Sequence, residues 1–237
     1  DICLAYGVPL ISGKDSMKND YRHGKWRISV PPTLLVSAVG RIDDISLAVT
    51  SDLKEAGDAI FVLGETKNEL GASEYYAMKG FVGANVPKVD FGRNLTLYRR
   101  LEAAIKNRLL ASCHDCSDGG LAVSLAECCI GGAVGAKVDL SSYVLDGVAG
   151  KTAKRSASSQ TGLTARQILF SESSGRFVVS VKKNDEQKFR LAMKGVKCER
   201  IGEVAAGENF EVALSEGEKF TLAVSKLREA WKRTMDW

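Results

Sequence analysis

Two hydrophobic patterns follow one another along most of the chain. Short apolar runs bounded by turn residues predict strands, whereas apolar residues at spacings of three and four predict amphipathic helices. From Gly57 onward the two patterns alternate, which predicts a mixed α/β layer fold. The predicted strands span residues 59–63, 136–140, 176–181, 197–204 and 210–214. The predicted helices span residues 72–79, 95–107 and 185–193.

The first 50 residues contain fewer and shorter elements. Residues 2–6 predict the last turn of a helix, residues 22–25 a hairpin turn, and residues 34–42 a strand. These elements are too few to form a complete core alone. We therefore predict an incomplete subdomain over residues 1–50, an α/β domain over residues 51–215, and a terminal helix within residues 216–237 whose apolar stripe contains Leu227 and Trp231.

Composition sets broad limits on the class of protein. With 237 residues and 45% hydrophobic content, the chain is long enough to bury a sizeable core. The longest apolar runs, such as residues 34–39, are too short to cross a bilayer and no signal peptide is visible, so we expect a soluble, cytoplasmic protein. The formal net charge is only +4, with basic residues scattered among acids, which argues against nucleic-acid binding. Residues 146–164 are rich in small residues and predict a mobile surface loop.

The segment Cys113-His114-Asp115-Cys116-Ser117-Asp118-Gly119-Gly120-Leu121 places acids, a hydroxyl and glycines where an apolar strand gives way to a helix. The helical spacing continues to Gly131-Gly132. Unpaired N–H groups and the helix dipole at such a junction attract an anion, and Asp115 is suited to the cation that accompanies a nucleotide phosphate. We expect Ser117 or Asp118 to cap the helix. An ordinary capped helix with a solvated second acid explains the same residues equally well.

A second junction follows the same logic. A short apolar run over residues 8–12 leads into Gly13, Lys14, Asp15 and Ser16, a combination suited to contact with phosphate or carboxylate oxygens. A Walker A loop is excluded, because its earlier glycine is missing and an acid stands directly after the lysine. The plain alternative for Lys14 is a solvated surface lysine.

Two further segments make the combination specific. Leu70-Gly71-Ala72-Ser73-Glu74-Tyr75 follows the strand over residues 58–64, and Leu169-Phe170-Ser171-Glu172-Ser173 runs into the strand that begins near Gly175. In this order the four segments resemble the C-terminal part of the synthetase region of phosphoribosylformylglycinamidine synthase, whose fold is shared with aminoimidazole ribonucleotide (AIR) synthetase. The resemblance extends from about residue 8 to residue 231 and covers nearly the whole chain.

The resemblance implies a fold, a reaction and a set of contacts. The fold is an AIR synthetase-like C-terminal α/β domain preceded by part of the N-terminal subdomain. The reaction is the ATP-dependent conversion of formylglycinamide ribonucleotide to its amidine, with ammonia supplied by glutamine hydrolysis and Mg²⁺ bound with ATP or ADP. No catalytic residue is implied within this chain, and we expect His114 to serve structure through a hydrogen bond. By motif position, the implied contacts are the nucleotide for Gly13, Lys14 and Ser117, the substrate phosphate for Ser16, and Mg²⁺ for Asp115.

In this family the synthetase region is an internal duplication, and the chain resembles only its second half. The chain begins with Asp1, so we expect a truncated polypeptide that is inactive alone. Its expected partners are the other half of the synthetase region and a glutaminase domain or subunit; alone it is expected to form a homodimer or to be poorly soluble. Lys14 matches the large single-chain form and residues 172–177 match the smaller synthases, so the assembly stays open. A nucleotide held permanently to stabilise the fold is an alternative to turnover.

Six cysteines allow a rival enzyme class. Cys113-x-x-Cys116 is similar to a thioredoxin-like redox motif, but such a domain would leave most other segments unexplained. A zinc site that includes Cys128 and Cys129 is disfavoured, because adjacent helical residues point about 100° apart and no second Cys-x-x-Cys pair exists. We expect six reduced, partly buried thiols.

Overall fold

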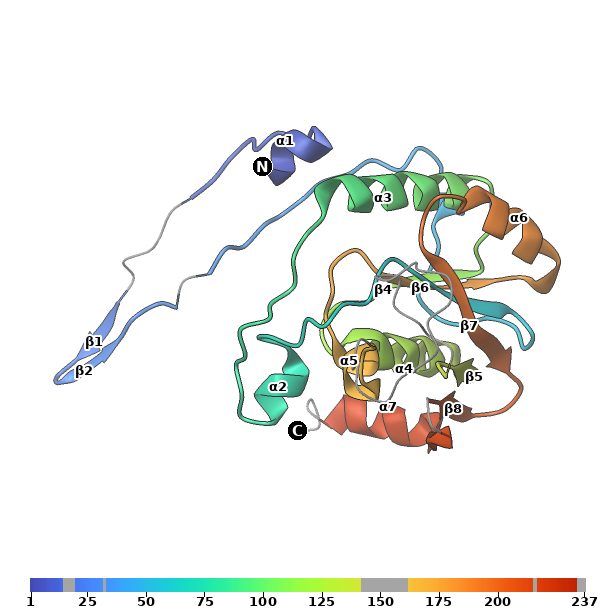
Figure 1. Cartoon of the computed structure of the whole chain (residues 1–237). Coiled ribbons are helices and arrows are strands. Elements are labelled where there is room, and N and C mark those ends of the chain that lie inside the picture. The colour runs from blue at the N-terminus through green and yellow to red at the C-terminus, as the bar shows by residue number, and fades with distance from the viewer. Residues whose placement is uncertain (15–19, 32, 142–161, 215–216, 234–237) are drawn as a thin grey trace. The chain divides into compact units, whose positions relative to one another are not determined.

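The computed structural model describes residues 1–14, 20–31, 33–141, 162–214 and 217–233, so most of the loop predicted over residues 146–164 lies outside the described residues (Figure 1). Contacts divide the chain into a first unit, Asp1–Ser46, and a second unit, Leu47–Trp237. The first unit contains α1 (Ile2–Tyr6) and an antiparallel hairpin of β1 (Tyr21–His23) and β2 (Trp26–Ile28). The predicted hairpin is therefore confirmed.

The prediction of a strand over residues 34–42 is wrong. In the structure these residues form neither a helix nor a strand, and they are all exposed. Leu34 and Val39 are 89% and 102% exposed. A strand leaves its backbone donors and acceptors unpaired unless a second strand lies beside it, and no described segment pairs with this one.

The second unit is built on one seven-stranded sheet with the order β4-β6-β3-β7-β5-β8-β9. All neighbouring strands are antiparallel except β5 and β8, which are parallel. The strands are β3 (Ala59–Leu63), β4 (Ser112–Asp115), β5 (Gly135–Asp139), β6 (Phe177–Val181), β7 (Cys198–Ala205), β8 (Asn209–Ala213) and β9 (Lys219–Ala223).

Helices cover both faces of this sheet. The helices of the second unit are α2 (Glu74–Met78), α3 (Phe91–Lys106), α4 (Gly120–Gly132), α5 (Ala165–Phe170), α6 (Glu186–Ala192) and α7 (Val224–Arg233), and the short 3-10 turns are η1 (Ile45–Leu47), at the boundary between the units in the sequence, and η2 (Lys183–Asp185). In Figure 1, α3 and α6 lie above the sheet, and α4, α5 and α7 lie below it. Among the described residues, no helix is both long enough and apolar enough to cross a membrane.

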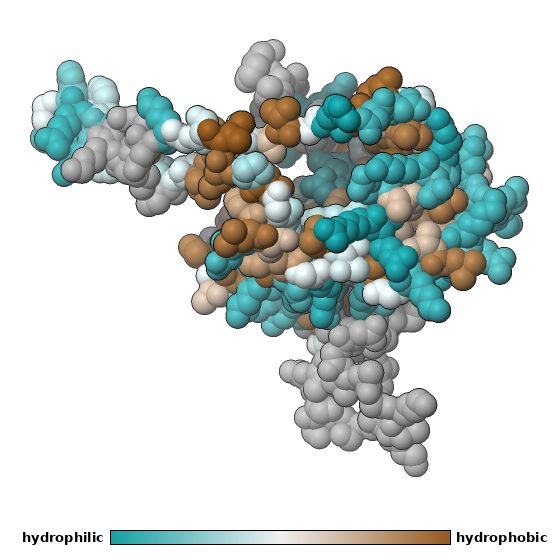
Figure 2. All heavy atoms as spheres, turned by 90° about the horizontal axis from the view of Figure 1, so that it is seen from above, coloured by the Kyte–Doolittle hydropathy of each residue, from teal (hydrophilic) through white to brown (hydrophobic). Residues whose placement is uncertain are grey.

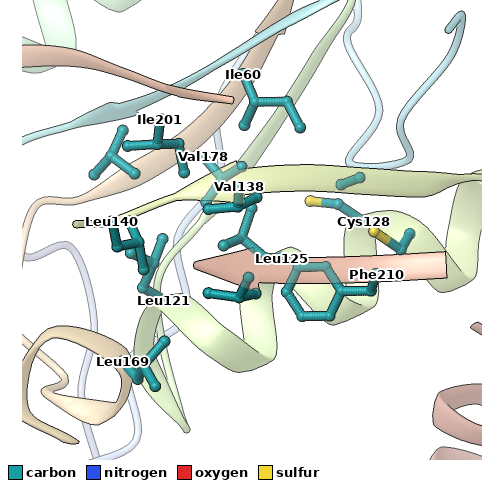
Figure 3. Packing of buried hydrophobic residues seen from close by; sticks show 14 of the residues in the cluster. Ile60, Leu121, Leu125, Cys128, Val138, Leu140, Leu169, Val178, Ile201 and Phe210 are labelled. Carbon is teal, nitrogen blue, oxygen red and sulfur yellow. The ribbon is translucent and has the colours of Figure 1, made fainter. Parts of the chain in front are cut away.

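The interior strand β3 shows why the sheet is covered on both sides. All five of its residues are buried. Ile60 and Val62 pack in one cluster with α4 and α5, while Phe61 and Leu63 pack in a second cluster with α3 and α6. Figure 3 shows the first cluster, in which Leu121 and Leu125 of α4 lie against strand residues such as Val138. A period of two with apolar residues on both faces is typical of a strand at the centre of three layers.

The helix α3 has one apolar stripe. Leu97, Leu101 and Ala104 are buried in the second cluster, at the spacing expected for one helix face. Its opposite side faces solvent, and the face seen from above in Figure 2, where α3 and α6 lie, is mainly hydrophilic. The helix begins four residues earlier than predicted, because the Asp90 side chain accepts a hydrogen bond from the Arg93 N–H and caps it.

Two predictions at the C-terminus need correction. Strand β9 was not predicted, and Leu222, assigned above to the terminal helix, belongs to this strand. The helix α7 is present and packs through Val224 and Leu227, but Trp231 is 61% exposed, so the predicted stripe is only partly buried. The other predicted strands and helices are confirmed within a few residues, and the mixed α/β class is confirmed.

Candidate functional site

The Asp115 turn lies at one edge of the sheet. Strand β4 pairs with β6 in a register that sets Asp115 opposite Phe177, and the Cys116 N–H donates to the Arg176 carbonyl at 2.9 Å. Cys116 is buried, whereas Asp115 and Ser117 are both exposed. The two residues predicted to contact Mg²⁺ and nucleotide therefore lie beside each other on the surface, where a ligand has access.

The opening of α4 differs from the prediction. Neither Ser117 nor Asp118 caps the helix; the N-cap is Gly119 at φ 78°, and it makes no side-chain cap. Gly120 follows at φ 66°, and a Cβ there would lie 2.5 Å from the Ser171 carbonyl oxygen. Glycine is required because the backbone is left-handed and packs directly on another chain segment. A capping serine or aspartate needs an extended backbone, which this approach excludes.

His114 lies between two acids. Its Nε2 is 2.9 Å from Glu127 Oε2 on α4, and its Nδ1 is 3.3 Å from Asp115 Oδ1. The Ser124 hydroxyl, also on α4, is 3.1 Å from the Asp115 carbonyl oxygen and 3.0 Å from that of Gly120. These contacts bind the end of β4 to the first turns of α4. The structural hydrogen bond expected for His114 is present.

Two more predicted motifs lie side by side. The Ser171 and Ser173 hydroxyls accept hydrogen bonds from the N–H groups of Glu69 and Lys67, at 3.3 and 3.0 Å. The Glu172 N–H donates to the Glu69 carbonyl oxygen at 3.2 Å. The segment 171–173 therefore satisfies the backbone of the segment 67–69, about a hundred positions away. The sequence singled out residues 169–173 and the motif 70–75 that directly follows this segment, but neither residues 67–69 nor their pairing with residues 171–173.

A buried cation anchors this pairing. Arg176 is only 1% exposed. Its Nε donates to the Ser173 carbonyl oxygen at 3.1 Å, one terminal nitrogen donates to Thr66 Oγ1 at 2.9 Å, and the other donates to the Ser171 carbonyl oxygen. A buried charge needs hydrogen-bond partners, and this guanidinium donates to three neutral oxygens.

Glu69 is a second buried residue with an ionisable side chain in the same region. It is 5% exposed, and its Oε1 accepts a hydrogen bond from the Lys88 N–H at 3.0 Å. Its Oε2 is buried and has no hydrogen-bond partner among the described residues. Nothing else in the described chain points to a ligand at this oxygen.

The predicted lysine loop belongs to the first unit. Gly13 and Lys14 are exposed and lie outside any helix or strand. Ser16 lies outside the described residues. These three contacts therefore stay predictions.

The thiols are unsuited to redox chemistry. All six cysteines are free, and Cys116, Cys128 and Cys129 are buried. Burial raises the pKa of the Cys113 thiol to about 12, with a further contribution from the nearby Asp115 charge. A reactive Cys-x-x-Cys pair needs a lowered pKa, so the geometry argues against the redox alternative. Among the described residues, no three or more His, Cys, Asp or Glu side chains are grouped so that they could hold a metal ion.

A cavity of about 470 Å³ lies elsewhere in the second unit, between the end of β3 and the first turns of α3. Its lining includes Gly64, Lys67, Arg93, Asn94 and Lys197. It contains none of the residues that sequence analysis assigned to a ligand.

Comparison with known proteins identifies the second unit. Residues 55–215 match the family model described as "AIR synthase related protein, C-terminal domain". The chain belongs to this family. The expected AIR synthase-like α/β fold is thereby confirmed.

Two curated relatives of the AIR synthase-related chain extend the similarity over its whole length. The phosphoribosylformylglycinamidine synthase subunit PurL of Leifsonia xyli subsp. xyli is 34% identical over 238 residues, which is 99% of the chain and 28% of the relative. PurL of Alkaliphilus metalliredigens is 32% identical over 235 residues, which is 98% of the chain and 29% of the relative. The chain thus spans under a third of the curated relatives that it matches.

Solved structures agree on the fold. T. maritima PurL complexed with FGAR superposes with a TM-score of 0.60 at 18% identity, over 77% of this chain and 30% of that chain. T. maritima PurL complexed with ATP gives a TM-score of 0.57, also at 18% identity, over 77% of this chain and 27% of that one. At this identity the likeness shows the AIR synthase-like architecture alone.

Proposed function

We propose that the chain is part of a phosphoribosylformylglycinamidine synthase, a purine-pathway ligase of the cytoplasm. The observation that carries this proposal is the identity of 32–34% to PurL subunits over nearly the whole chain. The proposed reaction consumes ATP, formylglycinamide ribonucleotide and ammonia derived from glutamine. Structures of T. maritima PurL with ATP, ADP and FGAR support the nucleotide and the substrate.

The proposed nucleotide contact in the second unit is the Asp115 turn. Ser117 is exposed two positions after Asp115, so its side chain is accessible to a phosphate. Gly13 and Lys14 of the first unit are the further proposed nucleotide contacts, and Ser16 is the proposed contact to the substrate phosphate. Lys14 would offset phosphate charge as a cation.

Asp115 fits the proposed Mg²⁺. Its side chain is 63% exposed, and its Oδ1 lies 3.3 Å from His114 Nδ1. Nucleotide-bound Mg²⁺ is held by one or two carboxylates together with phosphate oxygens and water, so a single exposed carboxylate is sufficient. When bound, Mg²⁺ would neutralise phosphate charge. The exposed Asp115 oxygens would hold it, while the hydrogen bond of His114 to Glu127 limits the movement of the end of β4.

The proposed partners are the other half of the synthetase region and a glutaminase domain or subunit. The relatives are named as PurL subunits, and a structure of PurLQS from Thermotoga maritima exists, which supports a glutaminase partner, either as a domain or as a subunit. Alone, the chain should form a homodimer or be poorly soluble, because residues 34–39 expose large apolar side chains such as Leu34 and Leu35. A monodisperse monomer in light scattering would contradict this expectation.

Calorimetric titration with ATP and with ADP, each with Mg²⁺, tests the proposed site. Binding to the wild-type chain should weaken about tenfold or more in Asp115→Ala, because one charged metal ligand is lost. The matched control is Asp118→Ala, an exposed acid in the same turn, which should change the Kd by less than about threefold. Equal affinities of wild type and Asp115→Ala would refute the metal assignment. The absence of binding to a folded wild-type chain would refute a nucleotide site formed by this half alone.

A further inference from the structure

Glu172 joins two segments that lie far apart in sequence. Its Oε1 accepts a hydrogen bond from the Gly119 N–H at 2.8 Å and another from the Glu74 N–H at 2.9 Å. Gly119 is the N-cap of α4, two positions after Ser117. Glu74 is the first residue of α2, directly after the loop Gly71–Ser73. One carboxylate oxygen therefore holds the openings of two helices close to each other.

The backbone of Glu172 is fixed independently of its side chain. Its N–H is bonded to the Glu69 carbonyl, and the hydroxyls of Ser171 and Ser173 on either side hold the segment 67–69. The Arg176 guanidinium then binds the carbonyls of both serines. The Glu172 side chain thus extends from a rigid base toward the Asp115 turn.

An ordinary helix cap does not account for this geometry. Capping α4 needs one acceptor near its first N–H groups, and a side chain of the turn itself usually supplies it. Here the turn supplies none, and the acceptor comes from a residue 53 positions away that also binds a second segment. A negative carboxylate is favoured at this place by the dipole of α4 and forms charge-assisted hydrogen bonds.

We infer that Glu172 is a positioning residue, which fixes the Asp115 turn relative to the loop Gly71–Ser73 and thereby sets the geometry in which Asp115 and Ser117 meet a nucleotide. This inference rests on the function proposed above for the turn. Glu172 need not touch the ligand, since it acts through the backbone of Gly119. Its two bonds depend on the reach of the side chain and on one oxygen acceptor.

Two substitutions of Glu172 distinguish the effect of its side-chain length from the effect of its charge. Glu172→Gln keeps the length and one carbonyl acceptor but removes the charge. Glu172→Asp keeps the charge but is one methylene shorter, so it cannot reach both donors from the fixed backbone. We expect the Kd for ATP with Mg²⁺ to stay within about threefold of wild type in the glutamine variant and to rise about tenfold in the aspartate variant. The matched control is Glu102→Asp, an exposed residue of α3 that should leave the Kd unchanged.

Amide hydrogen exchange provides a readout that needs no ligand. In Glu172→Asp the amides of residues 117–121 and 73–76 should exchange faster together, while in Glu172→Gln both should remain protected. Faster exchange in only one of the two segments, or in neither, would overturn the inference. So would a folded aspartate variant that binds nucleotide like wild type, because the link would then be structural only. If the folded wild-type chain binds no nucleotide, the proposed nucleotide site on this half alone is refuted, and the exchange pattern then decides whether Glu172 couples the two segments.

Discussion

The same apolar sequence pattern forms a strand in the second unit of the chain but not in the first. Residues 34–39 and residues 59–63 are both short apolar runs bounded by turn residues. The second run becomes β3, paired on both edges and buried on both faces. The first run forms no strand, and none of the described residues of the first unit is buried. An apolar run thus makes a strand only where its edges find partners and its faces find cover.

The proposed contacts divide along the same line. Asp115 and Ser117 lie on a turn that the second unit fixes through β4, α4 and Glu172. Gly13 and Lys14 lie in an exposed segment of the first unit that has no element of its own. The second unit therefore builds its part of the candidate site from its own residues, and the following substitutions examine how it does so.

The largest expected loss of stability follows from substitution of Arg176, the buried cation of the second unit. Arg176→Met keeps an unbranched side-chain stem but removes the guanidinium, which leaves the carbonyl oxygens of Ser171 and Ser173 without this donor. Each buried acceptor left unpaired costs about 1–3 kcal/mol, so the free energy of unfolding should fall by about 3 kcal/mol or more. Urea unfolding followed by circular dichroism measures this.

The control for that substitution is Arg166→Met on α5, where the arginine is exposed. It should change the free energy of unfolding by less than about 0.5 kcal/mol. Equal losses for the two variants would mean that the buried hydrogen bonds of Arg176 do not stabilise the fold.

The next largest effect is expected from a glycine substitution, for which one glycine of each unit can be compared. Gly120 has φ 66°, and a Cβ would meet the Ser171 carbonyl oxygen at 2.5 Å. Gly24 of the hairpin has φ 55°, with nothing within 4 Å of a Cβ. Both substitutions to Ala carry a left-handed penalty of about 1–2 kcal/mol, but only Gly120→Ala adds a backbone clash, for a total of about 2–3 kcal/mol.

The two glycine variants should affect different parts of the chain, and the urea midpoint of the second unit distinguishes them. Gly120→Ala should lower the urea midpoint of the second unit and weaken nucleotide binding at the Asp115 turn. Gly24→Ala should leave the midpoint of the second unit unchanged, because its cost is confined to the hairpin. A shift of that midpoint by Gly24→Ala would show that the first unit contributes to the stability of the second.

The elements that the sequence predicted correctly have strong local signals. β3 is a continuous apolar run, and α4 repeats Leu121, Leu125 and Cys128 at helical spacing. β9 was missed because Lys219 and Thr221 are polar and most of the strand is exposed at the sheet edge, so its stability comes from pairing with β8. Pairing between strands is a property of the whole fold and is invisible in a single segment.

The candidate site divides in the same way. Asp115 and Ser117 could be proposed because they stand within one short motif, and the structure does place them together on the surface. The cap of α4 was predicted wrongly because the local rule favours Ser or Asp, whereas the packing of Gly120 on Ser171 decides the backbone. The link from Glu172 to Gly119 spans 53 positions. In the sequence, the only sign of a role for Glu172 is its place between two serines in the segment 169–173.

The smallest expected effect is the change in the free energy of unfolding caused by a buried carboxyl group of the second unit. The first unit has no buried acidic residue among its described residues. Asp58, at the start of β3, is 4% exposed, and burial raises the pKa of its carboxyl above the ordinary value, opposed by a hydrogen bond from the Glu55 N–H. A raised pKa in the folded state means that the folded chain holds the proton more tightly, so this group favours folding at low pH. That contribution is lost as the pH rises through the folded pKa.

Asp58→Asn should therefore increase the free energy of unfolding at pH 7 relative to wild type, by less than either effect above, and the gain should shrink as the pH falls to about 4. Asp52 is the control of opposite sign, because hydrogen bonds from Lys54 and Thr50 lower the pKa of its carboxyl. Its stabilisation is present at neutral pH and is lost as the pH falls, so Asp52→Asn should reduce stability at pH 7. Urea unfolding of both variants between pH 4 and pH 7 measures the two slopes. Slopes of the same sign would mean that burial does not control the titration of Asp58, and that its hydrogen bond to the Glu55 backbone prevails.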